Sequence, residues 1–493
     1  MVDWSFCFRM DFIMTLKHPR SLRIFFLTEM WERYGFYVVQ TLLALYLSLH
    51  FKWPDQKIYA LVGSFTALTY ISPVLGGWIA DHLIGQRRCT LLGAFFLFLS
   101  YILFSFHASG YYLTFALSGI AVGTGLLKST ISSLLGNEYP VDSPLRESGF
   151  TIFYMGITTG IILGTTLPSL LNEHFGWSAS FSSAAFGLVF AFAIFTWGIK
   201  YLNIHDYHPY VFSLKKTMTA FTLILIMAVI AFMILSFPVL ANFAFITTII
   251  LSITYLLYSA YREPPEQSKK TISILFFCVI STIFWAFYFQ MFLSFTLFIT
   301  RIVDPTLFGF SFPAPYYVAV QSVGMLFIGF LISRQQSKSS ATAQCMSAAN
   351  KFLLAVLITT LSFGWLAYIA HLSLEISGTI SVALMVPVYL SFSFSELFLS
   401  PVGLSAITLL ASRKRVSTMT GIFFVSLGIG GFVAGKLANY TAVNQTDTAL
   451  TLLKTHYATG YFLLFKISCV ALLVCYILKH CINTCLRHAL ESK

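Results

Sequence analysis

The feature that most constrains this chain is its series of apolar stretches, each about as long as a membrane span. A helix needs roughly 20 apolar residues to cross a bilayer, and such stretches follow one another through most of the 493 residues. Hydrophobic residues make up 57% of the chain and charged residues only 10%, whereas soluble proteins carry about 25% charged residues. These proportions exclude an ordinary soluble enzyme and indicate a polytopic membrane protein.

The net charge of +12 raises the question of nucleic-acid binding. The basic residues are scattered among short loops and form no basic domain or arm, so we expect no nucleic-acid partner. The eight cysteines show neither a CxxC motif nor metal-ligand spacing. We therefore expect no metal and no prosthetic cofactor.

Hydropathy predicts fourteen helices separated by short, turn-rich breaks. The predicted spans are 22–49, 58–83, 89–107, 111–135, 150–171, 178–200, 217–237, 241–261, 271–300, 315–333, 352–371, 377–411, 416–438 and 458–480. The positive-inside rule orients them with both termini in the cytoplasm. In this orientation 22 of the 30 basic residues are cytoplasmic, and those expected outside are Lys52, Lys57, Arg301 and Lys454.

The longest basic breaks, 201–216 and 262–270, bracket one helix pair, with six helices before it and six after it. We therefore predict an all-α membrane protein of two six-helix bundles plus an inserted hairpin. The expected parts are a cytoplasmic segment at 1–21, a bundle at 22–200, the inserted pair with its loops at 201–270, a bundle at 271–480 and a cytoplasmic tail at 481–493. Many secondary transporters use two such halves for alternating access.

Three ionisable residues lie within the first predicted span, where an unpaired charge is costly and a functional role is the default hypothesis. Glu29, Glu32 and Arg33 share one helix face, which Tyr37 continues one turn further on. Two acids beside one base leave one carboxylate without a full partner. Burial and like charge then favour its protonated form, which suits a proton carrier. A purely structural ion-pair cluster is the alternative.

Two further charges within predicted spans are functional candidates, whereas Lys436 and Lys466, also within spans, are expected to snorkel or pack. Lys128 lies deep in the fourth span and needs a carboxylate, from the protein or from a substrate; snorkelling is the alternative. Glu396 is the only acid within a span of the second half, and it could also be a protonated packing residue. With Arg33 and Lys128 in one bundle and Glu396 in the other, a zwitterion could bridge the two. Such a ligand is held best when the bundles close around it.

Four motifs resemble signatures of the proton-dependent oligopeptide transporter family of the major facilitator superfamily, and the likeness extends over nearly the whole chain. Residues 29–37 resemble the ExxERFxYY motif, 76–88 the GGxxADxxxGxRR loop, 150–160 the FYxxINxG motif, and 395–405 the GELxLSPVGLS stretch. The inserted pair is like that of bacterial members. The resemblance implies a symporter in the plasma membrane, a bacterial inner membrane, with the proton as coupling ion. We also expect a monomer whose partners are substrate, protons and membrane lipid.

The resemblance also implies roles for individual residues. Glu29, Glu32 and Arg33 would couple protons, and Asp81, Arg87 and Arg88 would gate the cytoplasmic side, unless these loop charges only set topology. The candidate substrate-binding residues are Arg33, Tyr37, Gln40, Lys128, Thr158, Trp285, Gln290 and Glu396. Arg33 and Lys128 would receive the peptide carboxylate, and Glu396 the amine.

Several positions depart from the family pattern. An arginine often follows the motif arginine by seven residues, but here the residue is Gln40, and the usual acidic partner is Phe289. Both ends of that salt bridge are missing together, which leaves no unpaired charge, so the extracellular gate must close by another contact. The family asparagine is Thr158, an expected Asn-Pro is Gly324-Met325, and an expected Pro-Asn is Ser129-Thr130. The loss of these asparagine side chains removes hydrogen-bonding groups for the peptide ammonium, so the expected binding of the amine depends on Glu396.

The sequence therefore predicts a proton-coupled symporter that imports di- and tripeptides. One alternative is a transporter of the same fold for another carboxylate-bearing metabolite. A non-transporting peptide sensor is a second alternative. An intramembrane enzyme is disfavoured, because the chain contains no HExxH motif, no GxSxG motif and no aspartate pair within the spans.

Overall fold

The computed structural model describes residues 18–106, 110–140, 143, 145–206, 213–333, 341–412, 415–443 and 449–491. Within these ranges, eleven helices are long and apolar enough to cross a membrane. One of them, α6, is two helices joined at Gly176. Together with α2, which holds the buried charges, and the shorter apolar helix α11, they account for the fourteen predicted spans.

The first bundle contains α2 to α6. Its elements are α2 (Ser21–Leu45), the π-helical turn η1 (Tyr46–His50), α3 (Asp55–Ile79), the π-helical turn η2 (Ala80–Ile84), α4 (Gln86–Ser105), α5 (Tyr111–Asn137) and α6 (Leu145–Leu202). Gly176 divides α6 because its φ of 79° is a conformation that glycine adopts readily. Helix α2 packs against α6, and α5 packs against both α3 and α4.

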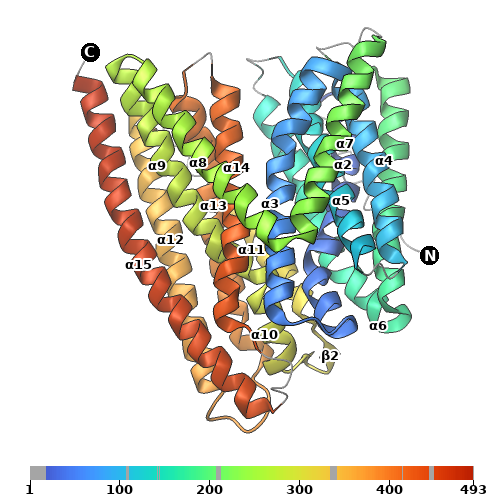
Figure 1. The fold of residues 1–493 in the computed structure, drawn as a ribbon, viewed down its shortest axis with the longest axis vertical. Helices are drawn as coiled ribbons and strands as arrows, with labels where there is room; N and C mark the ends of the chain where they lie inside the picture. The colour runs from blue at the N-terminus through green and yellow to red at the C-terminus, as the bar shows by residue number, and fades with distance from the viewer. Residues whose placement is uncertain are drawn as a thin grey trace.

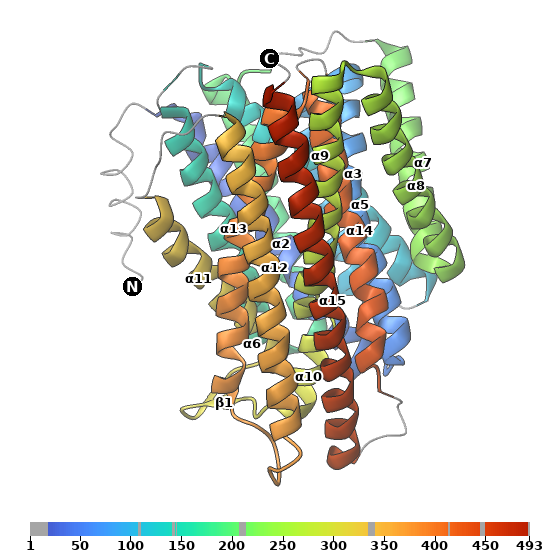
Figure 2. The ribbon, with the colours of Figure 1, turned by 90° about the vertical axis from the view of Figure 1, so that its left-hand side faces the viewer.

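The inserted pair consists of α7 (Leu214–Ser236) and α8 (Pro238–Arg262). Extended Phe237 and Pro238, which starts α8, form the sharp turn between them. Helix α7 packs against α5 of the first bundle, whereas α8 packs against α9 of the second. The hairpin therefore lies along the side of the molecule and contacts both bundles (Figures 1 and 2).

The second bundle contains α9 to α15. Its elements are α9 (Pro265–Tyr288), η3 (Phe289–Phe292), α10 (Ser294–Ile302), β1 (Thr306–Leu307), β2 (Phe310–Ser311), α11 (Ala314–Ser333), α12 (Ala341–Leu372), η4 (Val382–Leu384), α13 (Val386–Leu410), α14 (Val416–Ala438), η5 (Asn439–Thr441) and α15 (Leu450–Glu491). The two short strands pair antiparallel. Helix α12 packs against α13 and α15, and α9 packs against α14 and α15. The predicted all-α class with an inserted helix pair is confirmed.

Two predicted spans differ from the structure. The span 271–300 is not continuous, because α9 ends at Tyr288 and Leu293, with φ −120° and ψ −100°, separates η3 from α10. The span 377–411 begins only at Val386. The residues before it include the short 3-10 helix η4 and, ahead of that helix, Ile380, whose amide donates to the Ile302 carbonyl (2.9 Å) and whose carbonyl accepts from the Asp304 amide (2.8 Å). Tertiary pairing overrides apolar composition in this segment.

The two bundles meet along α3 and α14, and along α6 and α11. A Cβ atom added to Gly63 on α3 would lie 2.9 Å from the Cα atom of Gly435 on α14, so glycine is required for this close approach. We call the end with α10 and β1–β2 the outer end, and the end where α15 finishes the inner end. Figure 1 shows the second bundle leaning away from the first toward the inner end. The residues predicted as a tail from 481 continue helix α15 to Glu491.

Candidate functional site

The three charges on α2 are buried and form one ion-pair cluster. Arg33 donates two hydrogen bonds to Glu32, from Nε to Oε2 (2.5 Å) and from Nη2 to Oε1 (2.7 Å). Its Nε atom lies 3.3 Å from Oε1 of Glu29. The second oxygen of Glu29, Oε2, is buried and has no hydrogen-bond partner. The carboxylate that lacks a full partner is therefore Glu29.

Lys128 on α5 faces this cluster. Its ammonium lies 4.4 Å from the centre of the Tyr70 ring on α3, a cation–π contact. Glu29, Glu32 and Arg33 are close enough to interact with it electrostatically. Among the described residues no carboxylate forms an ion pair with Lys128. The geometry therefore leaves this ammonium open to an anionic group from a ligand.

Glu396 on α13 forms the opposite, acidic side of the site. Its Oε2 atom accepts hydrogen bonds from the Tyr288 hydroxyl (2.6 Å) and from Nε2 of Gln321 (2.8 Å). These donors belong to α9 and α11, so three helices of the second bundle position the carboxylate. Its other oxygen, Oε1, accepts no hydrogen bond from the described residues. That oxygen can accept a hydrogen bond from a ligand amine.

Aromatic side chains join the two sides. The ring centre of Tyr70 lies 5.5 Å from that of Phe289 and 6.5 Å from that of Trp285, and Trp285 lies 4.8 Å from Tyr288. Tyr37 packs against Phe292 at 6.3 Å. Both Tyr37 and Tyr70 interact electrostatically with Arg33 and with Glu396. The cationic and acidic groups therefore border one central region between the bundles.

Three predicted binding residues are engaged in helix packing. Gln40 donates to Thr66 (3.0 Å), and Gln290 donates to the Ala434 carbonyl (2.8 Å). The Thr158 hydroxyl donates to the Tyr154 carbonyl of its own helix (3.1 Å). The structure brings together Arg33, Tyr37, Lys128, Trp285 and Glu396, whereas these three side chains stabilise the surrounding helices.

Four residues at the site were not predicted. Tyr70, Tyr288 and Gln321 make the contacts described above, and Tyr154 on α6 interacts electrostatically with Glu29 and Glu396. Tyr154 lies inside the motif 150–160, and Tyr288 is next to Phe289, a position that departs from the family pattern, so a search for hydroxyl donors around these positions could have found both. No local signal marks Tyr70 or Gln321, because their role depends on which helices face each other.

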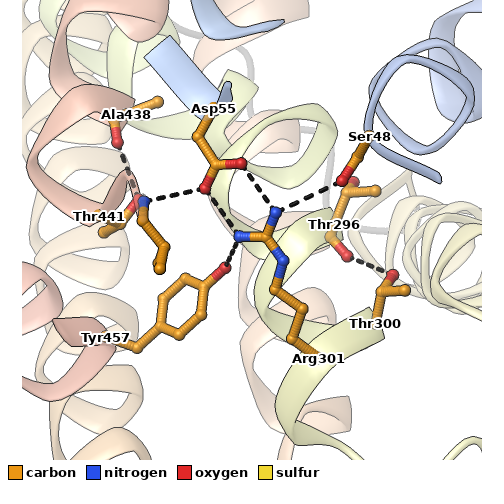
Figure 3. Close-up of polar contacts among 9 residues, drawn as sticks. Ser48, Asp55, Thr296, Thr300, Arg301, Ala438, Thr441 and Tyr457 are labelled. Carbon is orange, nitrogen blue, oxygen red and sulfur yellow. Dashed lines mark hydrogen bonds and ion pairs between the residues drawn. The ribbon is translucent and has the colours of Figure 1, made fainter. Parts of the chain in front are cut away.

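The outer end contains a buried polar cluster that joins the bundles (Figure 3). Arg301 on α10 donates to both carboxylate oxygens of Asp55, the first residue of α3, at 2.7 Å each. The same guanidinium donates to the Tyr457 hydroxyl (2.9 Å) and to the Ser48 hydroxyl (3.3 Å). The Val443 amide donates to Asp55 (3.0 Å). We call these five residues the outer latch; from the sequence alone, Arg301 is expected only in an outer loop.

The predicted gating loop lies at the inner end. Asp81 accepts a hydrogen bond from Gln86 (3.1 Å), and the amide side chain of Asn137 donates to Gln86 (3.1 Å). The backbone amide of Arg87 donates to Asp206, which follows α6 (3.1 Å). These bonds fix the inner ends of first-bundle helices. The gating role of Asp81, Arg87 and Arg88 stays a prediction.

The chain is similar to known proteins along most of its length. A family model described as the POT family matches residues 87–456. Dipeptide and tripeptide permease B of Yersinia enterocolitica is 28% identical over 456 residues, covering 89% of this chain and 90% of the permease. Dipeptide and tripeptide permease A of Erwinia pyrifoliae is 28% identical over 439 residues, covering 88% of each.

Solved structures share the fold. The structure of a bacterial homologue of the human drug peptide transporters matches with a TM-score of 0.81 at 24% identity, covering 95% of this chain and 99% of that one. A structure from work on substrate recognition in proton-dependent oligopeptide transporters matches with a TM-score of 0.80 at 23% identity, covering 94% and 99%.

Proposed function

Because the chain belongs to the POT family, a family of transporters rather than enzymes, we propose that it imports di- and tripeptides together with protons. The observation that carries the proposal is the pair of opposed charged groups, Lys128 with Arg33 on one bundle and Glu396 on the other. The relatives named dipeptide and tripeptide permeases, 28% identical over most of their length, support the substrate class.

A peptide is a zwitterion, and each of its ends has a counterpart in the site. Its carboxylate would bind the Lys128 ammonium, which has no carboxylate partner among the described residues. Its ammonium would donate to the free Oε1 atom of Glu396, which Tyr288 and Gln321 hold in place. Since these groups belong to different bundles, a bound peptide favours the state in which the bundles are close together.

Proton coupling is assigned to the cluster on α2. Arg33 is held by Glu32 through two hydrogen bonds, and Glu29 has an unpaired buried oxygen. Glu29 would therefore take the proton, because a neutral carboxyl costs less to bury there than a partly paired carboxylate. Protonation would weaken the attraction of Glu29 for Arg33 and release the guanidinium toward the substrate carboxylate.

Alternating access also requires that one end close while the other opens. The outer latch and the close α3–α14 contact hold the outer ends of the two bundles together, and the bundles diverge toward the inner end (Figure 1). With both termini in the cytoplasm, this arrangement would be an inward-facing state. In other family members a salt bridge is expected between the residues at positions 40 and 289, which here are Gln and Phe. The latch would supply the outer closure in its place.

The direct test is uptake of labelled dialanine into liposomes that contain the full chain. We expect accumulation under an inward proton gradient and its loss when a protonophore is added. Lys128→Gln should reduce uptake at least tenfold, whereas Lys351→Gln, which changes an exposed lysine on α12, should not. If dialanine still accumulated against its concentration gradient in the absence of a proton gradient, proton coupling would be refuted.

A transporter of another carboxylate-bearing metabolite remains a second candidate. It is favoured by the engagement of Thr158 with its own helix, because the amine side then depends on Glu396 alone. Competition separates the candidates: peptides with a free amino terminus should compete with labelled dialanine, and N-acetylated peptides should not. Saturable binding without uptake would instead identify a peptide sensor.

Cofactors, oligomeric state and orientation belong to the same proposal. Within the described residues no group of three or more His, Cys, Asp or Glu could hold a metal ion. We propose a monomer with both termini in the cytoplasm of a bacterial inner membrane. One structural neighbour is described as tetrameric in its crystals, with a TM-score of 0.80 at 24% identity, so mass photometry in nanodiscs is the relevant measurement.

A further inference from the structure

An apolar groove lies between α4, α6 and α7, away from the central site. It has a volume of about 370 Å³. Its lining is Ile84, Arg88, Leu91, Leu92, Phe95, Phe192, Thr217 and Phe221. Phe95, Phe192 and Phe221 are 39–50% exposed although they belong to membrane-spanning helices. In a bilayer, a groove of this kind faces the acyl chains of the lipids.

The inner end of this groove is basic. Arg88 lies on the same face of α4 as Leu91, Leu92 and Phe95, one turn nearer the inner end, and it is exposed. Helix α6 finishes at this end with exposed Lys200, and α7 begins there with exposed Lys215 and Lys216. Three helices therefore each place at least one exposed cation where the apolar lining ends.

Three acids lie near these cations, and one of them, Glu138, accepts a hydrogen bond from the amide of His205, the neighbour of Asp206. Asp206 accepts the Arg87 amide (3.1 Å), and Asp81 accepts a hydrogen bond from Gln86 (3.1 Å). Counting Arg87, Arg88, Lys200, Lys215 and Lys216, the cations outnumber these acids. The mouth of the groove therefore attracts anions.

We propose that this groove is a binding site for an anionic phospholipid. One acyl chain would fill the apolar lining, and the phosphate-bearing headgroup would lie among Arg88, Lys215 and Lys216. Charge complementarity selects the lipid, since a zwitterionic headgroup carries no net charge. Each lysine near an anionic lipid surface contributes about fivefold in affinity.

The position of the groove indicates what the lipid would do. Ala220, Ile224 and Met227 on α7 form an apolar cluster with Ile79, Cys89, Val122 and Leu126 of the first bundle. Phe221, on the adjoining face of α7, borders the groove. A lipid in the groove would cover the edge of this contact and hold α7 against the first bundle.

The test uses the full chain purified in detergent, with phosphatidylglycerol and phosphatidylcholine of identical acyl chains as probes. Native mass spectrometry measures the bound lipid, and the thermal unfolding midpoint measures its effect. We expect phosphatidylglycerol to bind more tightly and to raise the midpoint more. In Lys215→Gln/Lys216→Gln, phosphatidylglycerol affinity should fall on the order of 25-fold, with little change for phosphatidylcholine.

Two further variants complete the design. Leu92→Trp places a larger side chain in the groove and should reduce phosphatidylglycerol binding while the lysines stay in place. Lys351→Gln/Arg487→Gln removes two exposed cations outside the groove and should bind phosphatidylglycerol like the unmodified chain. Equal binding of the two lipids, or equal losses in the two double variants, would overturn the proposal and identify non-specific surface binding.

Discussion

Glu29 and Glu32 lie three residues apart on α2, but their carboxylate oxygens have different numbers of hydrogen-bond partners. Glu32 uses both oxygens on Arg33, whereas one oxygen of Glu29 is buried without a partner. The difference separates two functions that the sequence assigns to the cluster as a whole. Glu32 holds the arginine, and Glu29 is the better candidate for the proton.

We predict that Glu29→Gln abolishes gradient-driven accumulation of dialanine and preserves counterflow, because a neutral amide mimics the protonated carboxyl. Counterflow exchange and gradient-driven uptake in the same liposomes provide the comparison. Glu173→Gln, at an exposed position between the halves of α6, is the matched control. Full uphill uptake by Glu29→Gln would move the proton site to Glu32.

The other acidic residue, Glu396, should determine recognition of the amine. Removing the charge from a charge-assisted hydrogen bond costs about ten- to hundredfold in affinity. We therefore expect Glu396→Gln to raise the KM for dialanine by that factor, whereas N-acetylated dialanine should compete with dialanine in neither protein. A KM equal to that of the unmodified chain would show that the amine binds elsewhere.

At the scale of elements, the outer latch joins the start of α3 to α10, α15 and the segment after α14. Asp55 is 2% exposed, and it is held by two guanidinium bonds and one backbone amide. Breaking one partner of such a buried pair is strongly destabilising, by about 3–5 kcal/mol. Because the pair forms only when the outer side is closed, breaking it destabilises the outward-closed state relative to the outward-open state.

Arg301→Gln should therefore shift the population toward the outward-open state and reduce gradient-driven uptake at least tenfold. The exchange Asp55→Arg/Arg301→Asp restores the ion pair and should recover part of the uptake, although the Val443 amide then loses its acceptor. In a background without native cysteines, solvent accessibility of a single cysteine at position 66, where Thr66 is buried between Gln40 of α2 and Gly431 of α14, reports opening of the outer side. No change in accessibility would exclude the latch as a gate.

The close packing of α3 against α14 gives a second prediction at this scale. A side chain at Gly63 or Gly435 must overlap the backbone of the other helix, and overpacking costs about 1–3 kcal/mol. We expect Gly63→Val to lower the thermal unfolding midpoint and uptake together. At Gly329 a Cβ would lie 3.8 Å from Leu397, so Gly329→Ala should retain both; an unaffected Gly63→Val would contradict the packing argument.

At the scale of the whole molecule, the bundles should move as rigid bodies when the inner end closes and the outer end opens. Spin labels at positions 200 and 351 lie on different bundles, whereas labels at 351 and 479 lie on the same bundle. In a background without native cysteines, pulsed electron paramagnetic resonance should show that the distance between labels 200 and 351 shortens when peptide is added at acidic pH. The second distance should stay constant; movement of both pairs would exclude rigid-body rocking.

The inserted hairpin takes part in this motion, since α7 packs on the first bundle and α8 on the second. At its inner end, Arg415 on the loop before α14 donates to Ser259 of α8 and lies 3.5 Å from Glu263. The Phe237–Pro238 turn lies at the outer end, where the outer latch joins the bundles in this structure. The hairpin can therefore open at its inner end while its turn stays fixed.

Much of this protein follows from the sequence by itself. Long apolar stretches and the distribution of Lys and Arg determine the number of spans, because the bilayer sets a fixed length for every helix. The functional candidates among the buried charges are recognisable in the same way, because a charge within a span is costly unless it has a partner or a function. They are Glu29, Glu32, Arg33, Lys128 and Glu396.

Only the tertiary structure decided which of these groups lacks a partner and what surrounds them. Tyr288 and Gln321 position Glu396, and Asp55 meets Arg301 across 246 positions of sequence. The breaks at Leu293 and before Val386 also depend on neighbouring segments rather than on local composition. The physical reason is that hydropathy and helical periodicity are local properties, whereas hydrogen bonds and ion pairs between helices depend on how the helices face each other.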